Sequence, residues 1–344
     1  MRQRDPVEAR ADSSRDLYDI ATWEPRSRLD RLSGRVYGGV VRVARYLVYL
    51  LALLITIGIV AQTVSAAVEF VSFPVLGVLT GLSAIPALAL AAYVYVTDVT
   101  TDEPLSLLVA TFILSVLFAG FAAIVNSAFG FIQMFGPIGY VAFFFVVVAP
   151  VEESVKLLSV RLYAYRDDRF NAVIDGAVYG AVAGLGFATI ENGIYISRGV
   201  LNSTQAMGPG YLAQLGAAGG TTAVRALAGP GHVIYSAFAG YYLGLAKFNP
   251  DRAGPIVAKG ILIAAFIHAL YNTLATVGLP VLTAVFPDVP QLLLFLGFVV
   301  VYQGFFGYLL YRKLRRYARA YRAVRSDAER TGGDIDVEST EFDG

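Results

Sequence analysis

Four short stretches of this sequence carry side chains that can perform hydrolytic or metal chemistry. They contain a pair of glutamates with a lysine, a glutamate beside an asparagine, and the only two histidines of the chain: Glu152, Glu153, Lys156, Glu191, Asn192, His232 and His268. Such groups can activate water, donate a hydrogen bond to an oxyanion or bind a divalent metal. The chain contains no cysteine, so it has no thiolate nucleophile or ligand.

Helical spacing predicts which of the charged groups in the first stretch meet. Glu152 and Lys156 are four residues apart, in the favourable order for an ion pair on one helix face, whereas Glu153 points about 100° away. We therefore expect Lys156 to pair with Glu152 and to leave Glu153 free for chemistry. Pro150 lacks the amide hydrogen that would bond to Val146, so we expect a kink just before the glutamates.

Each histidine is followed, four residues later, by a small polar residue on the same helical face. Ser236 follows His232 in this way, and Asn272 follows His268. Either histidine alone is also explained as a hydrogen-bonding contact between packed helices. The recurrence of both patterns beside the two glutamate stretches favours a functional site over a purely structural one.

These stretches lie on segments that are apolar enough to cross a membrane. The chain has 344 residues, of which 56% are hydrophobic and 15% charged, and its net charge of +1 gives no support for nucleic acid as a partner. A spanning helix needs about 20 mostly apolar residues. Segments of that length lie at roughly 46–69, 74–96, 105–126, 139–164, 172–197, 222–247, 255–278 and 290–312. We predict an all-α, polytopic membrane helix bundle with about eight transmembrane helices.

The distribution of polar and basic residues predicts the domain organisation and the topology. Polar tails at 1–45 and 313–344 flank the bundle at 46–312, whose catalytic core is expected at about 140–275. The first span is too deep in the chain and too long for a cleaved signal peptide. Arginine and lysine gather after the fourth, sixth and eighth spans, which predicts a multi-pass cell-membrane protein with both termini in the cytosol. Asp175 and Arg225, near span ends, are expected at the interface.

Charged groups inside the spans are the strongest functional signal. Each costs about 2.5–3.5 kcal/mol near the bilayer centre, so such residues are rare and usually functional. In the predicted topology, Glu153, Glu191 and the two histidines fall between mid-membrane and the outer half, where one pocket can contain them. A transporter with a Glu/His proton relay is the alternative from another class, although matching broken helices are not evident.

In chain order, the motifs resemble the PrsW family of intramembrane proteases, which belongs to a superfamily with the CAAX prenyl proteases and bacteriocin-processing proteins. They are EExxK (Glu152, Glu153, Lys156), FxxxEN (Phe187, Glu191, Asn192), PGHxxxS (230–236) and HxxYN (His268, Tyr271, Asn272), within about 140–275. Glu191 stands where the CAAX branch typically has histidine, which favours the PrsW branch.

The resemblance implies an intramembrane endopeptidase that cleaves a membrane-anchored or membrane-proximal protein, such as an anti-sigma-factor-like regulator. It implies a catalytic centre with these members: Glu152, Glu153, Glu191, His232, His268 and Asn272. Lys156, Phe187 and Asn192 are expected to support it. Two histidines and several carboxylates suffice to hold Zn²⁺, with Glu153, Glu191, His232 and His268 as the candidate ligands. A metal-free mechanism, in which a buried glutamate activates water, stays open, as does the choice between Glu152 and Glu153 as the base.

Overall fold

The computed structural model describes residues 74–100, 103–207 and 211–331, with scattered helical positions between 28 and 68. The chain divides into two compact units, Met1–Ile57 and Gly58–Gly344. The described residues of the second unit form helices and no strand, which confirms the all-α prediction. Its helices are α3 (Pro74–Val96), α4 (Leu105–Ala128), α5 (Gly136–Phe143), α6 (Ala149–Leu162), α7 (Val173–Met207), α8 (Tyr211–Lys247), α9 (Ala253–Thr273), α10 (Leu279–Val285) and α11 (Gln291–Thr331).

Six segments of the described residues are long and apolar enough to cross a membrane, so the chain is a multi-span membrane protein. They are Val75–Val96, Leu105–Ala128, Gly130–Arg166, Val173–Val200, Pro250–Val285 and Gln291–Ala323. Each overlaps one of the expected spans. The expected span at 46–69 lies largely outside the described residues. The span expected at 222–247 is helical, but α8 is not among the six because glycine, tyrosine and histidine replace many of its aliphatic side chains.

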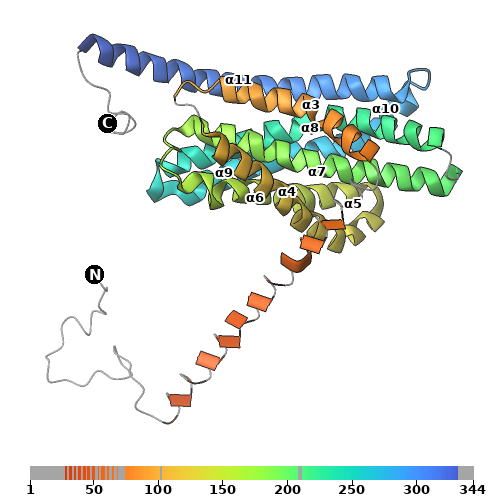
Figure 1. The fold of residues 1–344 in the computed structure, drawn as a ribbon, viewed down its shortest axis with the longest axis horizontal. Helices are drawn as coiled ribbons and strands as arrows, with labels where there is room; N and C mark the ends of the chain where they lie inside the picture. The colour runs from red at the N-terminus through yellow and green to blue at the C-terminus, as the bar shows by residue number, and fades with distance from the viewer. Residues whose placement is uncertain are drawn as a thin grey trace. The chain divides into compact units, whose positions relative to one another are not determined.

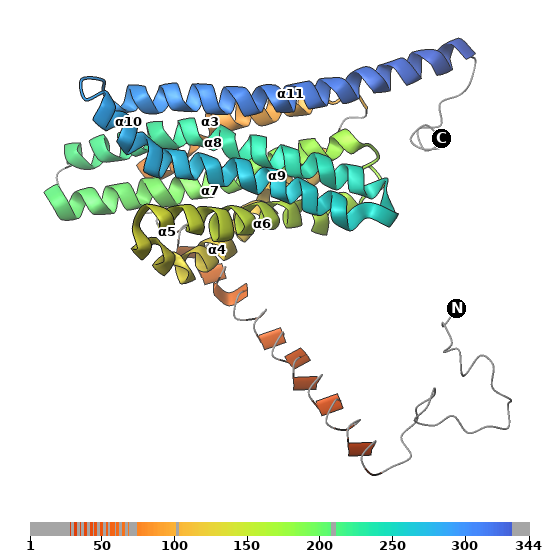
Figure 2. The same ribbon diagram turned by 180° about the vertical axis from the view of Figure 1, so that it is seen from behind.

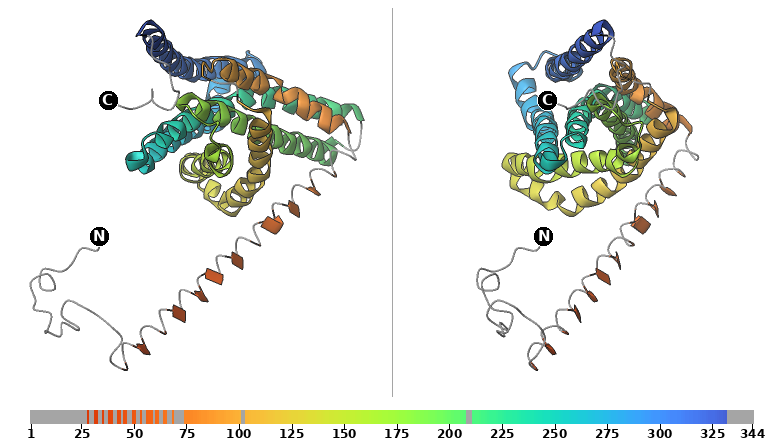
Figure 3. Two further views of the ribbon diagram at one scale, coloured as in Figure 1. Left: turned by 60° about the vertical axis from the view of Figure 1, so that its left-hand side comes forward. Right: turned by 90° about the vertical axis from the view of Figure 1, so that its left-hand side faces the viewer.

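Helices α7 and α8 run along each other through the middle of the second unit. Helices α3 and α11 lie on one side of this pair, and α4 and α6 lie on the other (Figures 1 and 2). The views in Figure 3 show the same pair enclosed by its neighbours. Glycine permits the close approach, because a Cβ atom on Gly180 would overlap the carbonyl oxygen of Ser236. The two helices that carry Glu191 and His232 are thereby held backbone to backbone.

A π-helical segment, Phe144–Val148, joins α5 to α6 directly before the glutamate pair. Its wider turn is closed by the amide of Ala149, which donates to the carbonyl of Phe144 five residues earlier. The expected interruption before Pro150 therefore takes the form of a π turn. The helix then continues to Leu162, so the two glutamates lie inside a continuous helical segment.

A second π-helical segment, Leu274–Gly278, joins α9 to α10 shortly after His268. The amide of Leu279 donates to the carbonyl of Leu274, and Pro280 follows one residue later. In both cases a single residue separates the π turn from a proline, and the wider turn relieves the clash of the proline ring with a preceding carbonyl. They place irregular backbone next to the glutamate and histidine stretches.

Helices α7, α8 and α11 are longer than the spans that the sequence predicts. Helix α8 begins at Tyr211 and continues through Pro230. Helix α11 continues past Arg312 to Thr331. The early start of α8 places Arg225 well inside a helix and toward the interior of the bundle.

Candidate active site

The structure pairs Lys156 with Glu153 rather than with the expected Glu152. Lys156 Nζ donates to Glu153 Oε1 at 2.6 Å, and both side chains are fully buried. The prediction was wrong because residues three apart are also neighbours on a helix. Contacts from other helices determine which of the two glutamates pairs with Lys156. Glu153 Oε2 accepts a hydrogen bond from Ser236 on α8 at 3.2 Å. Glu153 is therefore held on both oxygens.

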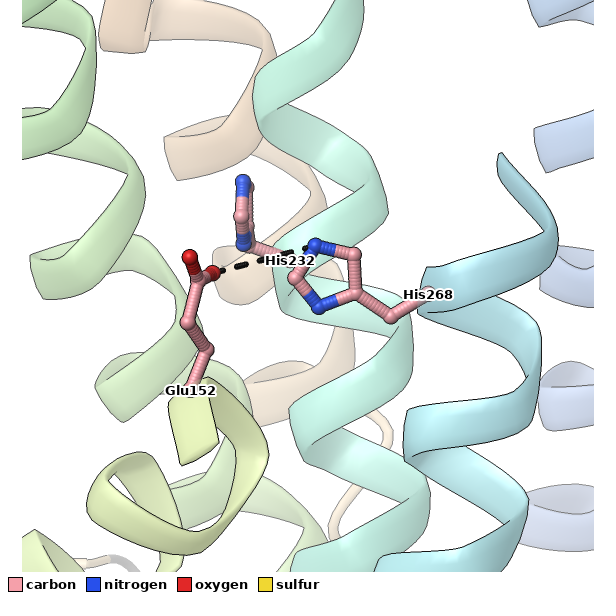
Figure 4. A group of neighbouring side chains, drawn as sticks. All are labelled: Glu152, His232 and His268. Atoms are coloured by element: carbon pink, nitrogen blue, oxygen red, sulfur yellow. Dashed lines mark ion pairs between the residues drawn. The ribbon is translucent and has the colours of Figure 1, made fainter. Parts of the chain in front are cut away.

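Glu152 is the member of the pair that faces a cavity. Its Oε1 accepts a hydrogen bond from the side-chain amide of Asn126 on α4 at 2.9 Å. Its Oε2 is buried, and within the described part of the chain it has no hydrogen-bond partner. The nearest basic atom is Nε2 of His268, 3.7 Å away. Figure 4 shows Glu152, His232 and His268 pointing toward one another from α6, α8 and α9.

The partners of His268 define which of its nitrogens is available. Nδ1 lies 2.8 Å from Glu153 Oε1, which already accepts from Lys156. A carboxylate only accepts, so Nδ1 carries the hydrogen, and a neutral ring has its lone pair on Nε2. Two lone-pair atoms, Nε2 of His268 and Oε2 of Glu152, therefore face each other across 3.7 Å.

His232 lies between a cation and a carboxylate. Its Nδ1 is 2.9 Å from Lys156 Nζ, and its Nε2 is 2.8 Å from Glu191 Oε2. Because an ammonium group only donates, Nδ1 accepts and Nε2 donates to Glu191. The rings of His232 and His268 have centroids 5.1 Å apart in an edge-on arrangement. The chain's two histidines thus occupy one site.

Arg225 is a member of this site that sequence reasoning assigned to the membrane interface. Its Nη2 donates to Glu191 Oε2 at 2.5 Å, and its Nε donates to the side-chain oxygen of Asn192 at 2.8 Å. The expected start of the span at 222 made Arg225 look terminal, whereas α8 begins at Tyr211. A usable signal was its position seven residues before His232, on the same helical face.

Asp175, also expected at the interface, is fully buried near the start of α7. Its Oδ2 accepts hydrogen bonds from the backbone amides of Asn171 and Ala172 at 2.8 Å each. Oxygens of Asp98, Glu103 and Asp175 lie near one another in a second acidic group. That group shares no residue with the histidine site.

A cavity of about 940 Å³ connects the site to the end of the bundle where α5 begins. Most of the predicted site residues line it, and Arg225 does so as well. Those predicted residues are Glu152, Phe187, Glu191, His232, His268 and Asn272. Glu153, Lys156 and Asn192 lie behind this wall. Phe187 also packs against the site from α7, because Lys156 Nζ lies 4.4 Å from its ring centroid.

The residues at the base of the cavity fit a metal ion. Glu152, His232 and His268 each offer one ligand atom, and these atoms lie within 4.8 Å of one another. An imidazole lone pair and an unpartnered carboxylate oxygen are ligands that Zn²⁺ prefers. Of the expected ligands, Glu153 is instead held by Lys156, His268 and Ser236. Its contact with His268 Nδ1 resembles the outer carboxylates that orient metal-binding histidines.

Comparison with known proteins agrees with these motifs. Residues 103–305 match the family described as PrsW family intramembrane metalloprotease. The chain is 30% identical over 203 residues to Protease PrsW of Shouchella clausii (strain KSM-K16), covering 59% of this chain and 86% of that protein. It is 31% identical over 193 residues to Protease PrsW of Geobacillus kaustophilus (strain HTA426), covering 55% and 76%.

A third relative, Protease PrsW of Bacillus subtilis (strain 168), is 27% identical over 194 residues, which cover 56% of this chain and 79% of that protein. No solved structure gives a significant match. The region that matches the family, 103–305, contains all four motifs and the base of the cavity. The resemblance seen in the motifs is therefore confirmed, and this multi-span membrane protein is a peptidase that belongs to the PrsW family of intramembrane metalloproteases.

Proposed function

We propose that the chain is an endopeptidase that cleaves a membrane-anchored or membrane-proximal protein with a water molecule activated beside Glu152 and His268. One observation carries this proposal. Glu152 Oε2 has no hydrogen-bond partner among the described residues, and it faces the lone pair of His268 Nε2 at 3.7 Å in the base of the cavity. Two acceptors held face to face in a buried site require a cation, a proton or a water molecule between them.

In the metal-free form of the mechanism, Glu152 is proposed as the general base. A carboxylate at the edge of a buried cavity can take a proton from water and return it to the leaving amine. The hydrogen bond from Asn126 to the other oxygen of Glu152 fixes the direction of the carboxylate. Glu153 fixes the ring of His268 from behind, so that Nε2 stays directed at the cavity.

Zn²⁺ is proposed as the cofactor, held by Glu152, His232 and His268. A zinc ion there would supply a water molecule that is nucleophilic at neutral pH and would polarise the scissile carbonyl. Binding through Nε2 of His232 would require its hydrogen to pass to Glu191 Oε2 at 2.8 Å while Lys156 Nζ, 2.9 Å away, gives a proton to Nδ1, so that the ring stays neutral. In the metal-free alternative, Glu152 and His268 Nε2 together orient the attacking water.

Asn272 is proposed to donate to the oxyanion that forms on the substrate carbonyl. It lies one helical turn after His268 and lines the same cavity, and removal of one such donor typically lowers kcat about 10²–10³-fold. The catalytic core proposed for 140–275, between the polar tails at 1–45 and 313–344, contains all of these residues except Asn126. With both termini in the cytosol, the cavity would open toward the outer side of the membrane and accept a substrate segment there.

The proposal is tested by cleavage of a membrane-anchored candidate substrate in proteoliposomes. We expect Glu152→Gln and His268→Ala to lower kcat at least about a hundredfold. Glu103→Gln, which removes a buried carboxylate from the separate acidic group, is the matched control and should keep the wild-type rate. Undiminished cleavage by both site variants would contradict the assignment. Ion flux that depends on Glu191 and His232, without proteolysis, would support the transporter alternative instead.

A further inference from the structure

We infer that Arg225 is a positioning residue that holds the Glu191 carboxylate in the geometry needed for cleavage. This inference rests on the proposed function, because the position of Glu191 matters only if the cavity is the catalytic site. Arg225 lies on α8, whereas its partners all lie on one stretch of α7. The guanidinium group therefore joins the two central helices at the wall of the cavity.

Three contacts fix the plane of the Arg225 guanidinium. Nη2 donates to Glu191 Oε2 at 2.5 Å, and Nε donates to Asn192 Oδ1 at 2.8 Å. The ring of Tyr195 lies 4.5 Å from the guanidinium carbon, one helical turn beyond Glu191. Asn192 is itself held by Ser83 of α3, because its side-chain nitrogen donates to the hydroxyl oxygen at 3.0 Å. Asn192 and Tyr195 therefore hold the arginine in place in addition to the charge of Glu191.

The same oxygen of Glu191 receives Arg225 and His232. His232 Nε2 lies 2.8 Å from Glu191 Oε2, so this atom links the guanidinium to the imidazole. The Glu191 side chain is 20% exposed and lines the cavity, and these two donors hold it against rotation into the open space. Without Arg225, the carboxylate would lose its charge partner and its fixed direction toward His232.

Lysine is not an equivalent of Arg225 at this position. The planar guanidinium group reaches acceptors on two adjacent residues, Glu191 and Asn192, with two different nitrogens. An ammonium group is a point charge on a flexible chain and lacks this forked geometry. We therefore expect Arg225→Lys to keep the charge near Glu191 but to recover only part of the lost activity.

A double-mutant cycle tests whether Arg225 acts through Glu191. We expect Arg225→Ala to lower kcat about 10- to 100-fold with little change in KM, because substrate binding is not its role. In a Glu191→Gln background, the same change should lower the residual kcat less than about twofold, since residues that act as a unit are not additive. Arg198→Ala is the control, because Arg198 lines the cavity but is exposed. It should change kcat by the same factor whether residue 191 is Glu or Gln.

The outcomes separate this inference from the proposed function. Full activity of Arg225→Ala, or an equal loss with and without Glu191, would overturn the positioning role while leaving the active site in place. Wild-type activity of Glu191→Gln would instead count against the role of Glu191 itself. Thermal unfolding in detergent shows whether Arg225→Ala folds. If it does not fold, the cycle is run with Arg225→Lys, which keeps a cation at this position, and with Asn192→Ala, which keeps the arginine. Both should show the same coupling to Glu191.

Discussion

The Lys156 ammonium group lies 2.6 Å from the Glu153 carboxylate, and neither side chain is exposed. It also lies 2.9 Å from His232 Nδ1. Removal of one partner from a buried ion pair typically costs about 3–5 kcal/mol, because the remaining charge has no compensation. We therefore expect Lys156→Met to lower the free energy of unfolding by about this amount and to abolish cleavage.

The matched control for this change is the variant that carries both Lys156→Met and Glu153→Gln. It removes both charges, so its loss of stability should be smaller than that of Lys156→Met alone. Unfolding in a mild detergent measures both. Equal stability of wild type and Lys156→Met would show that Lys156 does not stabilise the buried negative charge of Glu153.

Metal binding should raise both the stability of the protein and its cleavage activity. A ligand that binds only the folded state at 100 times its Kd stabilises the protein by about 2.7 kcal/mol. Zn²⁺ added to chelator-treated protein should therefore raise Tm and restore cleavage in the wild type, and should do neither in Glu152→Gln or His268→Ala. Metal content measured after dialysis provides an independent reading. A metal-free protein that cleaves at the full rate would contradict the metal proposal.

The contact between α7 and α8 should be sensitive to a single methyl group. A Cβ atom on Gly180 would overlap the carbonyl oxygen of Ser236, the residue that donates to Glu153. We expect Gly180→Ala to cost about 1–3 kcal/mol of stability, the usual range for overpacking, and to lower activity. Gly77→Ala on α3 is the control, since a Cβ there meets no atom within 4 Å. Its thermal stability should be unchanged or slightly raised.

Glu103 should make the stability of the fold depend on pH. Burial and the neighbouring Asp98 raise the pKa of this carboxyl group against an opposing hydrogen bond from Tyr179, and the net result is a pKa of about 7. The folded state therefore binds a proton more tightly than the unfolded state, whose pKa is about 4.5. Stability should fall as pH rises from about 4.5 to about 7 and then level off.

Thermal unfolding measured between about pH 5 and 8 checks this dependence. Glu103→Gln mimics the protonated group, so its Tm should vary less with pH than that of the wild type. Each kcal/mol corresponds to about 2–4 °C in a protein of 150–250 residues, and a somewhat smaller change is expected in this longer chain. If Tm varied with pH in the same way in both proteins, other groups would cause the pH dependence of stability, and Asp175 is the nearest candidate.

The sequence was sufficient to predict the class of fold and the meeting of Glu152, Glu191 and the two histidines in one cavity. A long apolar segment in lipid has no water to bind its backbone groups, and a helix satisfies their hydrogen bonds within the segment itself. Polar groups as rare as His232 and His268 inside such segments are explained most simply by a shared site. For these two features, local composition and helical spacing carried the necessary information.

Partners on other helices could not be predicted in the same way. Spacing favoured Glu152 as the partner of Lys156, but Asn126 draws one glutamate toward α4, while His268 and Ser236 draw the other toward α8 and α9. Arg225 was misplaced for a related reason, since hydropathy marks where a segment becomes apolar and not where its helix begins. The first error concerns contacts between helices, which no single helix encodes, and the second concerns the point at which a helix begins.

The π turn at Phe144–Val148 determines the rotation of everything that follows it in α6. A π turn contains one residue more than an α-helical turn, and one residue corresponds to about 100° of rotation about the helix axis. If the same residues were wound as an uninterrupted α-helix, Glu152 and Glu153 would face different neighbours. The direction in which the two carboxylates point is therefore set by a single extra peptide unit upstream of them.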